Sequence, residues 1–241
     1  MPATTPEELL EIAELLAERG ARGFLLSGGA DASGKVKMAS FSDAIREVKS
    51  TTDLQVNAHI GLASGEEIRK LVRSGVDSFS VDVYGSDETI REVLGLDARA
   101  EDYLRVVKQL QDEGAFVAPH MCVGIHGGQL KGELRALDML SPLMPKVLVL
   151  ISLVPTKGTS YQDVVPPSKE MVMSVVRSAR EMLPETKLTL GCMRSKKDRA
   201  SEADIVMAGL DGIVLPSART VETLKSEGYS VKKRSVCCSL I

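Results

Sequence analysis

Three of the four cysteines stand where they could bind a metal together. Cys192 directly follows a short apolar run, and Cys237 and Cys238 lie near the end of the chain. Adjacent cysteines can hardly form a relaxed disulfide with each other. If the tail returns to Cys192, three thiolates meet, and three thiolates can hold an iron–sulfur cluster or a zinc ion. Three unrelated free thiols remain the alternative. The fourth cysteine, Cys122, is expected to pack in the core.

All three histidines fall at or near the ends of apolar runs, at His59, His120 and His126. Imidazole is a common metal ligand, and catalytic zinc takes three protein ligands. The spacings are loose and no H-x-H pair occurs. A histidine-bound metal site and three hydrogen-bonded loop histidines therefore both stay open.

A glycine pair follows the first apolar run, in Ser27-Gly28-Gly29. Paired glycines let the backbone come close to a ligand and present its amides and carbonyls. The segment is not a dinucleotide fingerprint, because no G-x-G-x-x-G opens the following helix, and no Walker motif follows it. It is a candidate ligand loop, and it is equally compatible with an ordinary turn.

Asp82 lies inside the apolar run 79–84. A buried carboxylate is costly unless something pairs with it. Its partner is expected to be a ligand hydroxyl, such as that of a ribose, or else a cation at a neighbouring strand end. Asn57, one strand earlier, is likewise a polar strand residue expected to bond a ligand or a neighbouring strand end.

The elements that must position these residues alternate between strands and helices. Amphipathic helical stretches separate the apolar runs, which is the pattern of a parallel sheet with right-handed crossovers. A closed barrel needs eight strands, so the sequence predicts an α/β fold of the TIM-type (β/α) barrel class that is incomplete. An open doubly wound sheet is the competing fold. In such barrels the active site lies at the C-terminal ends of the strands. The seven predicted strands cover residues 23–26, 54–57, 78–84, 115–123, 147–154, 187–190 and 212–215.

Composition fits one domain in a reducing compartment. The 241 residues are 44% hydrophobic, enough for one sizeable core. We expect a partial barrel over residues 1–228 and a tail over 229–241. A net charge of −3 with only 3% aromatic residues favours neither a nucleic-acid partner nor a membrane surface. No apolar run reaches about 20 residues, and the start resembles no signal peptide. The free thiols suggest a cytoplasmic protein.

Several segments together resemble the radical S-adenosylmethionine (SAM) superfamily. The resemblance is to the branch with biotin synthase, the related hydrogenase-maturation enzyme and the two-component lipoyl synthases of archaea. The glycine segment resembles the family's motif for the methionyl amino group, and the Gly-Cys-Met-Arg and Cys-Cys-Ser-Leu segments resemble those of the lipoyl-synthase-type members. The segments that carry the resemblance are Leu26–Gly29, Val81–Ser86, Glu88–Leu96, Pro119-His120, Gly124–Gly128, Gly132-Glu133, Val154–Thr156, Gly158-Thr159, Gly191–Arg194 and Cys237–Leu240.

This resemblance implies sulfur insertion into an octanoyl chain on a carrier-protein lysine. It implies SAM as a cofactor and an auxiliary [4Fe-4S] cluster on Cys192, Cys237 and Cys238 that donates sulfur. A lipoyl-carrier protein or a small molecule would be the substrate, and a second radical SAM subunit is a possible partner. The residues expected to contact SAM are Ser27, Gly28, Gly29, Asn57, Asp82 and His120.

One departure from the family is large. The C-x3-C-x2-C loop that holds the SAM-cleaving cluster in this superfamily does not occur in the sequence. A truncated product, half of a split enzyme and a degenerate relative without radical chemistry would each explain this. The alternatives to sulfur insertion are therefore a non-catalytic or split-partner subunit that binds SAM, and a histidine-dependent metalloenzyme of barrel type.

Overall fold

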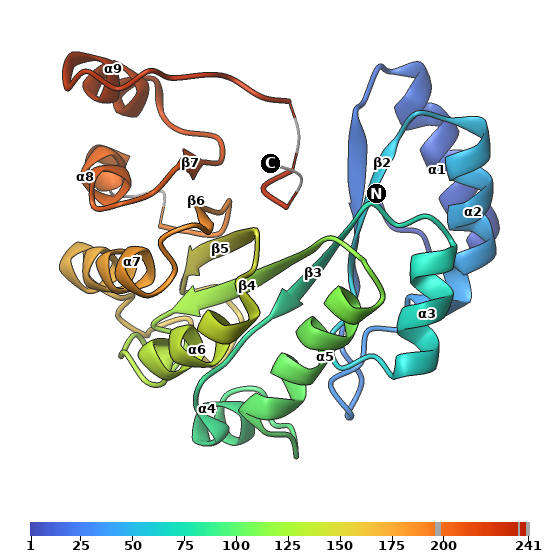
Figure 1. The fold of residues 1–241 in the computed structure, drawn as a ribbon, viewed down its shortest axis with the longest axis horizontal. Helices are drawn as coiled ribbons and strands as arrows, with labels where there is room; N and C mark the ends of the chain where they lie inside the picture. The colour runs from blue at the N-terminus through green and yellow to red at the C-terminus, as the bar shows by residue number, and fades with distance from the viewer. Residues whose placement is uncertain (196–198, 236, 240–241) are drawn as a thin grey trace. The chain divides into compact units, whose positions relative to one another are not determined.

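The computed structural model describes residues 1–195, 199–235 and 237–239. The strands follow the expected pattern closely (Figure 1). The third ends two residues earlier than predicted, at Asp82, and the seventh has only two residues. In chain order the strands are β1 (Gly23–Leu26), β2 (Gln55–His59), β3 (Ser78–Asp82), β4 (Val117–Val123), β5 (Val147–Ser152), β6 (Lys187–Leu190) and β7 (Gly212–Ile213).

Helices fill the connections between the strands. Several begin at a serine or threonine cap, which supplies an acceptor for the free amides of the first turn. Thr5 and Ser64 form full capping boxes with Glu8 and Glu67. The α-helices are α1 (Pro6–Glu18), α2 (Ser42–Thr51), α3 (Gly65–Arg73), α4 (Asp87–Glu92), α5 (Ala100–Asp112), α6 (Glu133–Leu140), α7 (Lys169–Met182), α8 (Glu202–Met207) and α9 (Ala218–Ser226).

The strands form one sheet in the order β1 to β7, the same order as in the chain. Strand pairs such as β1–β2, β4–β5 and β5–β6 are parallel. Sequential parallel strands joined by helices are the arrangement of a TIM-type barrel. The described residues supply seven such strands, so the predicted fold class, an incomplete (β/α) barrel, is confirmed.

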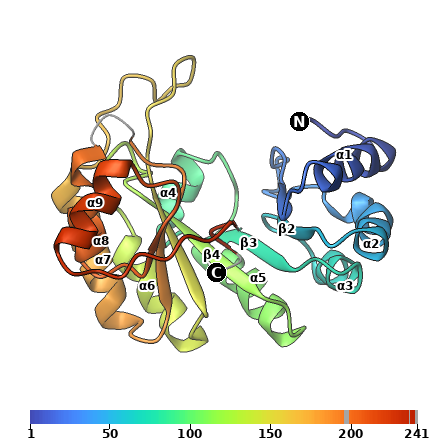
Figure 2. The same ribbon diagram turned by 90° about the horizontal axis from the view of Figure 1, so that it is seen from above.

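Two compact units divide the chain. Unit 1 comprises residues 1–81, 101–118 and 235–241, and unit 2 comprises residues 82–100 and 119–234. In unit 1, helices α1, α2 and α3 follow one another beside β1 and β2 (Figure 2). The predicted division at residue 228 stays a prediction, and residues 236 and 240–241 of its tail lie outside the described residues.

Alternation along the strands separates an apolar face from a polar one. Val56 and Ala58 on β2 and Phe79 and Val81 on β3 are fully buried. Successive strand side chains point to opposite faces, so the residues between them share the other face. Burying a side chain such as Phe79 stabilises the fold by about 1.5–3 kcal/mol. The polar face is where the candidate site lies.

None of the helices in the described part of the chain has the length and apolar character that crossing a membrane requires.

Candidate functional site

Three polar side chains of unit 1 share the second face of β2 and β3. Asn57, Ser78 and Ser80 are all buried, and Asn57 stands opposite Ser78 in the strand register. The Ser80 hydroxyl donates to Asn57 Oδ1 at 3.1 Å. Buried polar groups need partners, so a surface of this kind is built to meet another polar segment or a ligand.

The C-terminal segment of the chain is that partner. The Ser78 hydroxyl donates to the Ser239 carbonyl at 2.8 Å, and the Ser80 and Ser239 hydroxyls lie 3.0 Å apart. Asn57 Nδ2 contacts Cys237 Sγ at 3.5 Å. Figure 2 shows the C-terminal segment beside β3. Because Ser239 is itself buried, the segment is held by the strands of unit 1 and carries the two cysteines with it.

The two adjacent thiols differ in their surroundings. Cys238 is buried, Cys237 is half-buried, and their sulfurs lie 3.8 Å apart. Hydrogen bonds from the Cys238 thiol, the Ser239 backbone and Asn57 outweigh burial and lower the pKa of Cys237 to about 5. Cys237 is therefore a thiolate at neutral pH, and the thiolate is both the nucleophile and the metal-binding form of cysteine.

Cys192 lies in unit 2, on the loop that follows β6 as the sequence predicts, and it is exposed. The loop is tightly held. A Cβ on Gly191 would lie 2.6 Å from Ile151, and Ser152 N donates to the Met193 carbonyl at 2.9 Å. Binding of one cluster by Cys192, Cys237 and Cys238 together stays a prediction, because Cys192 belongs to a different unit from the other two.

A buried ion pair fixes the Cys192 loop within unit 2. Arg194 donates from Nε and Nη2 to Glu202 Oε1 at 3.0 and 2.8 Å, and from Nη1 to the Gly191 carbonyl at 2.7 Å. Burial opposes charge on Glu202, but hydrogen bonds from Thr220, Ser217 and Arg194 hold its pKa below the usual value. The sequence predicts no anchoring role for Arg194, which belongs only to the Gly191–Arg194 segment of the resemblance.

The glycine loop of unit 1 is open. Ser27, Gly28 and Gly29 are exposed, and a Cβ on Gly29 would meet nothing within 4 Å. Ser27 Oγ lies 3.3 Å from His59 Nδ1, so His59 belongs to this loop's surroundings. The loop can present its backbone to a ligand, but contact with SAM stays a prediction.

Asp82 and His120, the other two residues expected to contact SAM, lie in unit 2. Both are half-buried, and Asp82 is the last residue of β3. The expectation that Asp82 is a carboxylate buried inside a strand is wrong, because the strand ends there. The charge of Asp82 acts on the thiol of Cys122. The pKa of Cys122 is raised to about 12, mainly by burial and further by the charges of Asp82 and Glu133.

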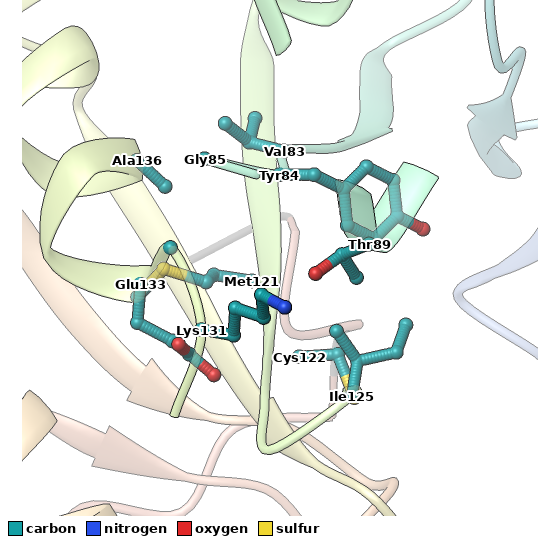
Figure 3. Close-up of a pocket in the computed structure, with 11 residues that line it drawn as sticks. Val83, Tyr84, Gly85, Thr89, Met121, Cys122, Ile125, Lys131, Glu133 and Ala136 are labelled. Carbon is teal, nitrogen blue, oxygen red and sulfur yellow. The ribbon is translucent and has the colours of Figure 1, made fainter. Parts of the chain in front are cut away.

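Glu133 lies beside a cavity of unit 2 that the sequence did not predict (Figure 3). The cavity is small, about 10 Å³, which is about the space of one water molecule. Gly124 N donates to Glu133 Oε1 at 2.8 Å, whereas Oε2 is buried and has no partner in the described part of the chain. Only the Gly-Glu pair in the resemblance pointed to this carboxylate. The lining residues include Tyr84, Thr89, Cys122, Lys131 and Glu133.

A metal site formed by all three histidines stays a prediction, because they are divided between the two units. His59 belongs to unit 1, and His120 and His126 belong to unit 2. His126 lies near Glu88 and Glu92, with ligand atoms within 4.8 Å of one another. Glu88 is ion-paired with Lys131, so its charge is already balanced without an ion.

Comparison with known proteins identifies the family. The Radical SAM superfamily matches residues 1–139. The biotin synthase of Christiangramia forsetii is 25% identical over 178 residues (72% of this chain and 48% of that protein). The biotin synthase of Wolinella succinogenes is 26% identical over 213 residues (87% and 74%). The FeFe-hydrogenase maturase HydG from Carboxydothermus hydrogenoformans superposes with a TM-score of 0.70 at 18% identity, over 95% of this chain and 59% of that one.

The family match covers more than half of the chain, and this chain therefore belongs to the radical SAM superfamily. It spans between about half and three quarters of these two curated relatives. The family implies SAM and a [4Fe-4S] cluster, whose ligands are three cysteines in a C-x3-C-x2-C loop. The four cysteines of the sequence are at 122, 192, 237 and 238, so they do not fit that cluster. Cys237 has a lowered pKa and lies beside a second thiol, which is suitable chemistry for a metal ligand, and an additional metal centre at these cysteines stays a prediction.

Proposed function

We propose that this chain takes part in radical SAM sulfur insertion of the lipoyl type, acting on an octanoyl chain attached to a carrier-protein lysine. The observation that carries the proposal is the Cys237–Cys238 pair, held by Asn57 and Ser239 on the polar face of β2 and β3. Soft thiolate ligands select iron–sulfur clusters. A cytoplasmic location, where disulfides are rare, is also part of the proposal, because none of the four cysteines forms a disulfide in the described part of the chain.

The cysteines would hold an auxiliary [4Fe-4S] cluster together with Cys192. When bound, that cluster would supply the sulfur. Asn57 and Ser239 keep the Cys237 thiolate oriented, and Arg194 keeps the Cys192 loop in one conformation. The residues proposed to bind SAM are Ser27, Gly28, Gly29, Asn57, Asp82 and His120.

The cluster that cleaves SAM has no ligand set in this sequence, so no step through it is assigned to these residues. A second radical SAM polypeptide, or a further segment of the same protein, would have to bring the C-x3-C-x2-C loop. The carrier protein would be the second partner.

Sulfur tracing tests the proposal. The chain is reconstituted anaerobically with iron and ³⁴S-labelled sulfide. It is then given SAM, a reductant, an octanoyl-lysyl carrier domain and a radical SAM polypeptide that carries the C-x3-C-x2-C loop. We expect lipoyl product that contains ³⁴S, as read by mass spectrometry of the carrier.

The matched controls are two cysteine variants. Cys237→Ala should abolish the labelled product, because it removes a proposed ligand. Cys122→Ala should keep it, because Cys122 lies in β4 with a raised pKa and no proposed ligand role. Labelled product from Cys237→Ala, or unlabelled product from the wild type, would contradict the proposal.

A second function is favoured by one observation, the lack of C-x3-C-x2-C in the sequence. The chain would then be a non-catalytic or split-partner subunit that binds SAM. Equilibrium dialysis with labelled SAM distinguishes the two functions. This alternative predicts SAM binding by a chain that takes up no iron, whereas sulfur insertion requires iron.

A further inference from the structure

Helix α1 carries a one-sided row of glutamates, here named the acidic stripe. It consists of Glu7, Glu11, Glu14 and Glu18, at spacings of four, three and four residues. These spacings put side chains on one face of an α-helix. All four are exposed, and none has an ion-pair partner within the described residues. Their charges repel one another, so a cationic surface laid along the helix would relieve that repulsion.

A surface of the opposite charge lies on the next two helices of the same unit. Arg46 on α2 and Arg69, Lys70 and Arg73 on α3 line a hollow of about 280 Å³, here named the basic groove, together with Glu66. All are exposed. Four cations and one carboxylate give the groove a local charge of about +3 on a chain whose net charge is −3.

The charges of the groove are only partly satisfied by the chain itself. Lys70 and Arg73 have no acidic partner in the part of the chain that the structure describes. Arg46 pairs with Asp43 of its own helix, and Arg69 lies 3.9 Å from Glu113. Exposed ion pairs of this kind are weak and exchange readily. The groove is therefore open to a partner with several carboxylates.

We propose that the acidic stripe of one copy of this chain binds in the basic groove of a second copy. The two surfaces are opposite in charge, with four carboxylates on the stripe and four cations beside one carboxylate in the groove. The stripe extends about 16 Å along its helix, whereas packed helices lie about 8–10 Å apart. One stripe can therefore reach Arg46 on α2 and the cations of α3 together.

This contact is head-to-tail, because the two surfaces are different. Such contacts build rings or open chains of copies instead of ending at a two-fold dimer. The attraction is electrostatic between exposed groups, so salt should weaken it strongly. We expect assemblies that grow with protein concentration at low ionic strength and dissociate to single copies at high salt.

Charge-reversal variants of the full chain test this by analytical ultracentrifugation at about 20 mM and about 500 mM salt, on either side of strong screening. Glu11→Lys/Glu14→Lys disables the stripe, and Lys70→Glu/Arg73→Glu disables the groove. Each variant alone should sediment as single copies at low salt. An equimolar mixture should form a 1:1 complex and nothing larger, because each variant retains the surface that the other lacks.

The control is Glu181→Lys/Glu185→Lys, which changes the net charge by the same amount as the stripe variant at exposed positions elsewhere. It should associate like the wild type. Wild-type chain that stays single at low salt would overturn the proposal, as would a variant mixture that forms no complex. If association is lost in the groove variant but kept in the stripe variant, another acidic segment fills the groove. That result would also overturn the proposal. Circular dichroism confirms that each variant folds.

Discussion

Cys237 and Cys122 have opposite acidities for reasons that lie within a few ångströms of each sulfur. Cys237 receives hydrogen bonds from Cys238, Ser239 and Asn57, and its pKa is about 5. Cys122 is desolvated and lies near the charges of Asp82 and Glu133, and its pKa is about 12. The same side chain is thus an ionised ligand or nucleophile at one position and an inert thiol at the other.

Alkylation should separate these two thiols. We predict that Cys237 of the unreconstituted chain reacts with iodoacetamide with a midpoint near pH 5, while Cys122 stays unmodified at neutral pH. The measurement is peptide mass spectrometry of chain quenched at successive pH values. A Cys237 midpoint near pH 8–9, the range of an unperturbed thiol, would show that its hydrogen bonds do not act as described.

The lowered pKa of Cys237 also determines how its contribution to the free energy of unfolding changes with pH. Its folded pKa lies below its unfolded value, so its stabilisation is complete above the unfolded pKa and is lost as the pH falls through about 5. We predict that Cys237→Ser, which cannot ionise in this range, loses more unfolding free energy relative to wild type at pH 8 than at pH 5. Urea unfolding at both pH values measures this. A loss that is equal at the two pH values would contradict the assignment.

At the scale of elements, the Arg194–Glu202 pair connects the Cys192 loop to α8. Glu202 Oε2 also accepts from Ser217 N and Thr220 Oγ1 at 3.0 and 2.7 Å, so α9 belongs to the same network. Removing one partner of a buried pair leaves the other charge unpaired, at a cost of about 3–5 kcal/mol.

Arg194→Ala should therefore lower the free energy of unfolding by about that amount in urea titrations. The matched control is Arg177→Ala on the exposed side of α7, where a change within about 0.5 kcal/mol is expected. Equal effects of the two variants would mean that the buried pair does not hold the loop.

Two glycines let the loop after β3 approach the start of α6. A Cβ on Gly85 would lie 2.0 Å from the Gly132 carbonyl oxygen, and Gly132 has φ +101°. We predict that Gly85→Ala destabilises the chain by about 1–3 kcal/mol, the usual cost of forcing atoms into a packed site. Gly29→Ala, which meets nothing within 4 Å, is the control for thermal unfolding. Unchanged stability of Gly85→Ala would show that the two segments can separate freely.

The elements were predictable because their signals are local. The periodicity of apolar residues located all seven strands. The docking of the tail was not predicted, because Asn57 and Cys237 are 180 residues apart and no local pattern links them. The serines at 78 and 80, alternating with buried apolar residues, were the available signal for a polar partner. The burial of Asp82 was overestimated, because an apolar run does not reveal where its strand ends.

Over the length of the chain, the longest-range contacts join the C-terminal residues Cys237 and Ser239 to β2 and β3. Ser239 supplies hydrogen-bond partners for the hydroxyls of Ser78 and Ser80, and both of these serines are buried. The superposition on the hydrogenase maturase, with a TM-score of 0.70, supports the barrel-type fold seen here.

Removal of residues 235–241 should therefore loosen β2 and β3 and leave β5 and β6 unchanged. Hydrogen–deuterium exchange of the full and shortened chains measures this strand by strand. Faster exchange confined to β2 and β3 is the expected result. Equal protection in the two chains would show that the tail contributes nothing to those strands.

The proposed iron–sulfur centre on Cys192, Cys237 and Cys238 is decided by the iron content of reconstituted chain. After anaerobic reconstitution and desalting, we predict about four iron atoms per wild-type chain and per Cys122→Ala chain, as expected for a [4Fe-4S] cluster. Cys192→Ala and Cys237→Ala should lose most of that iron while remaining folded. Folded wild-type chain without bound iron, or the same iron content in all four proteins, would contradict the claim.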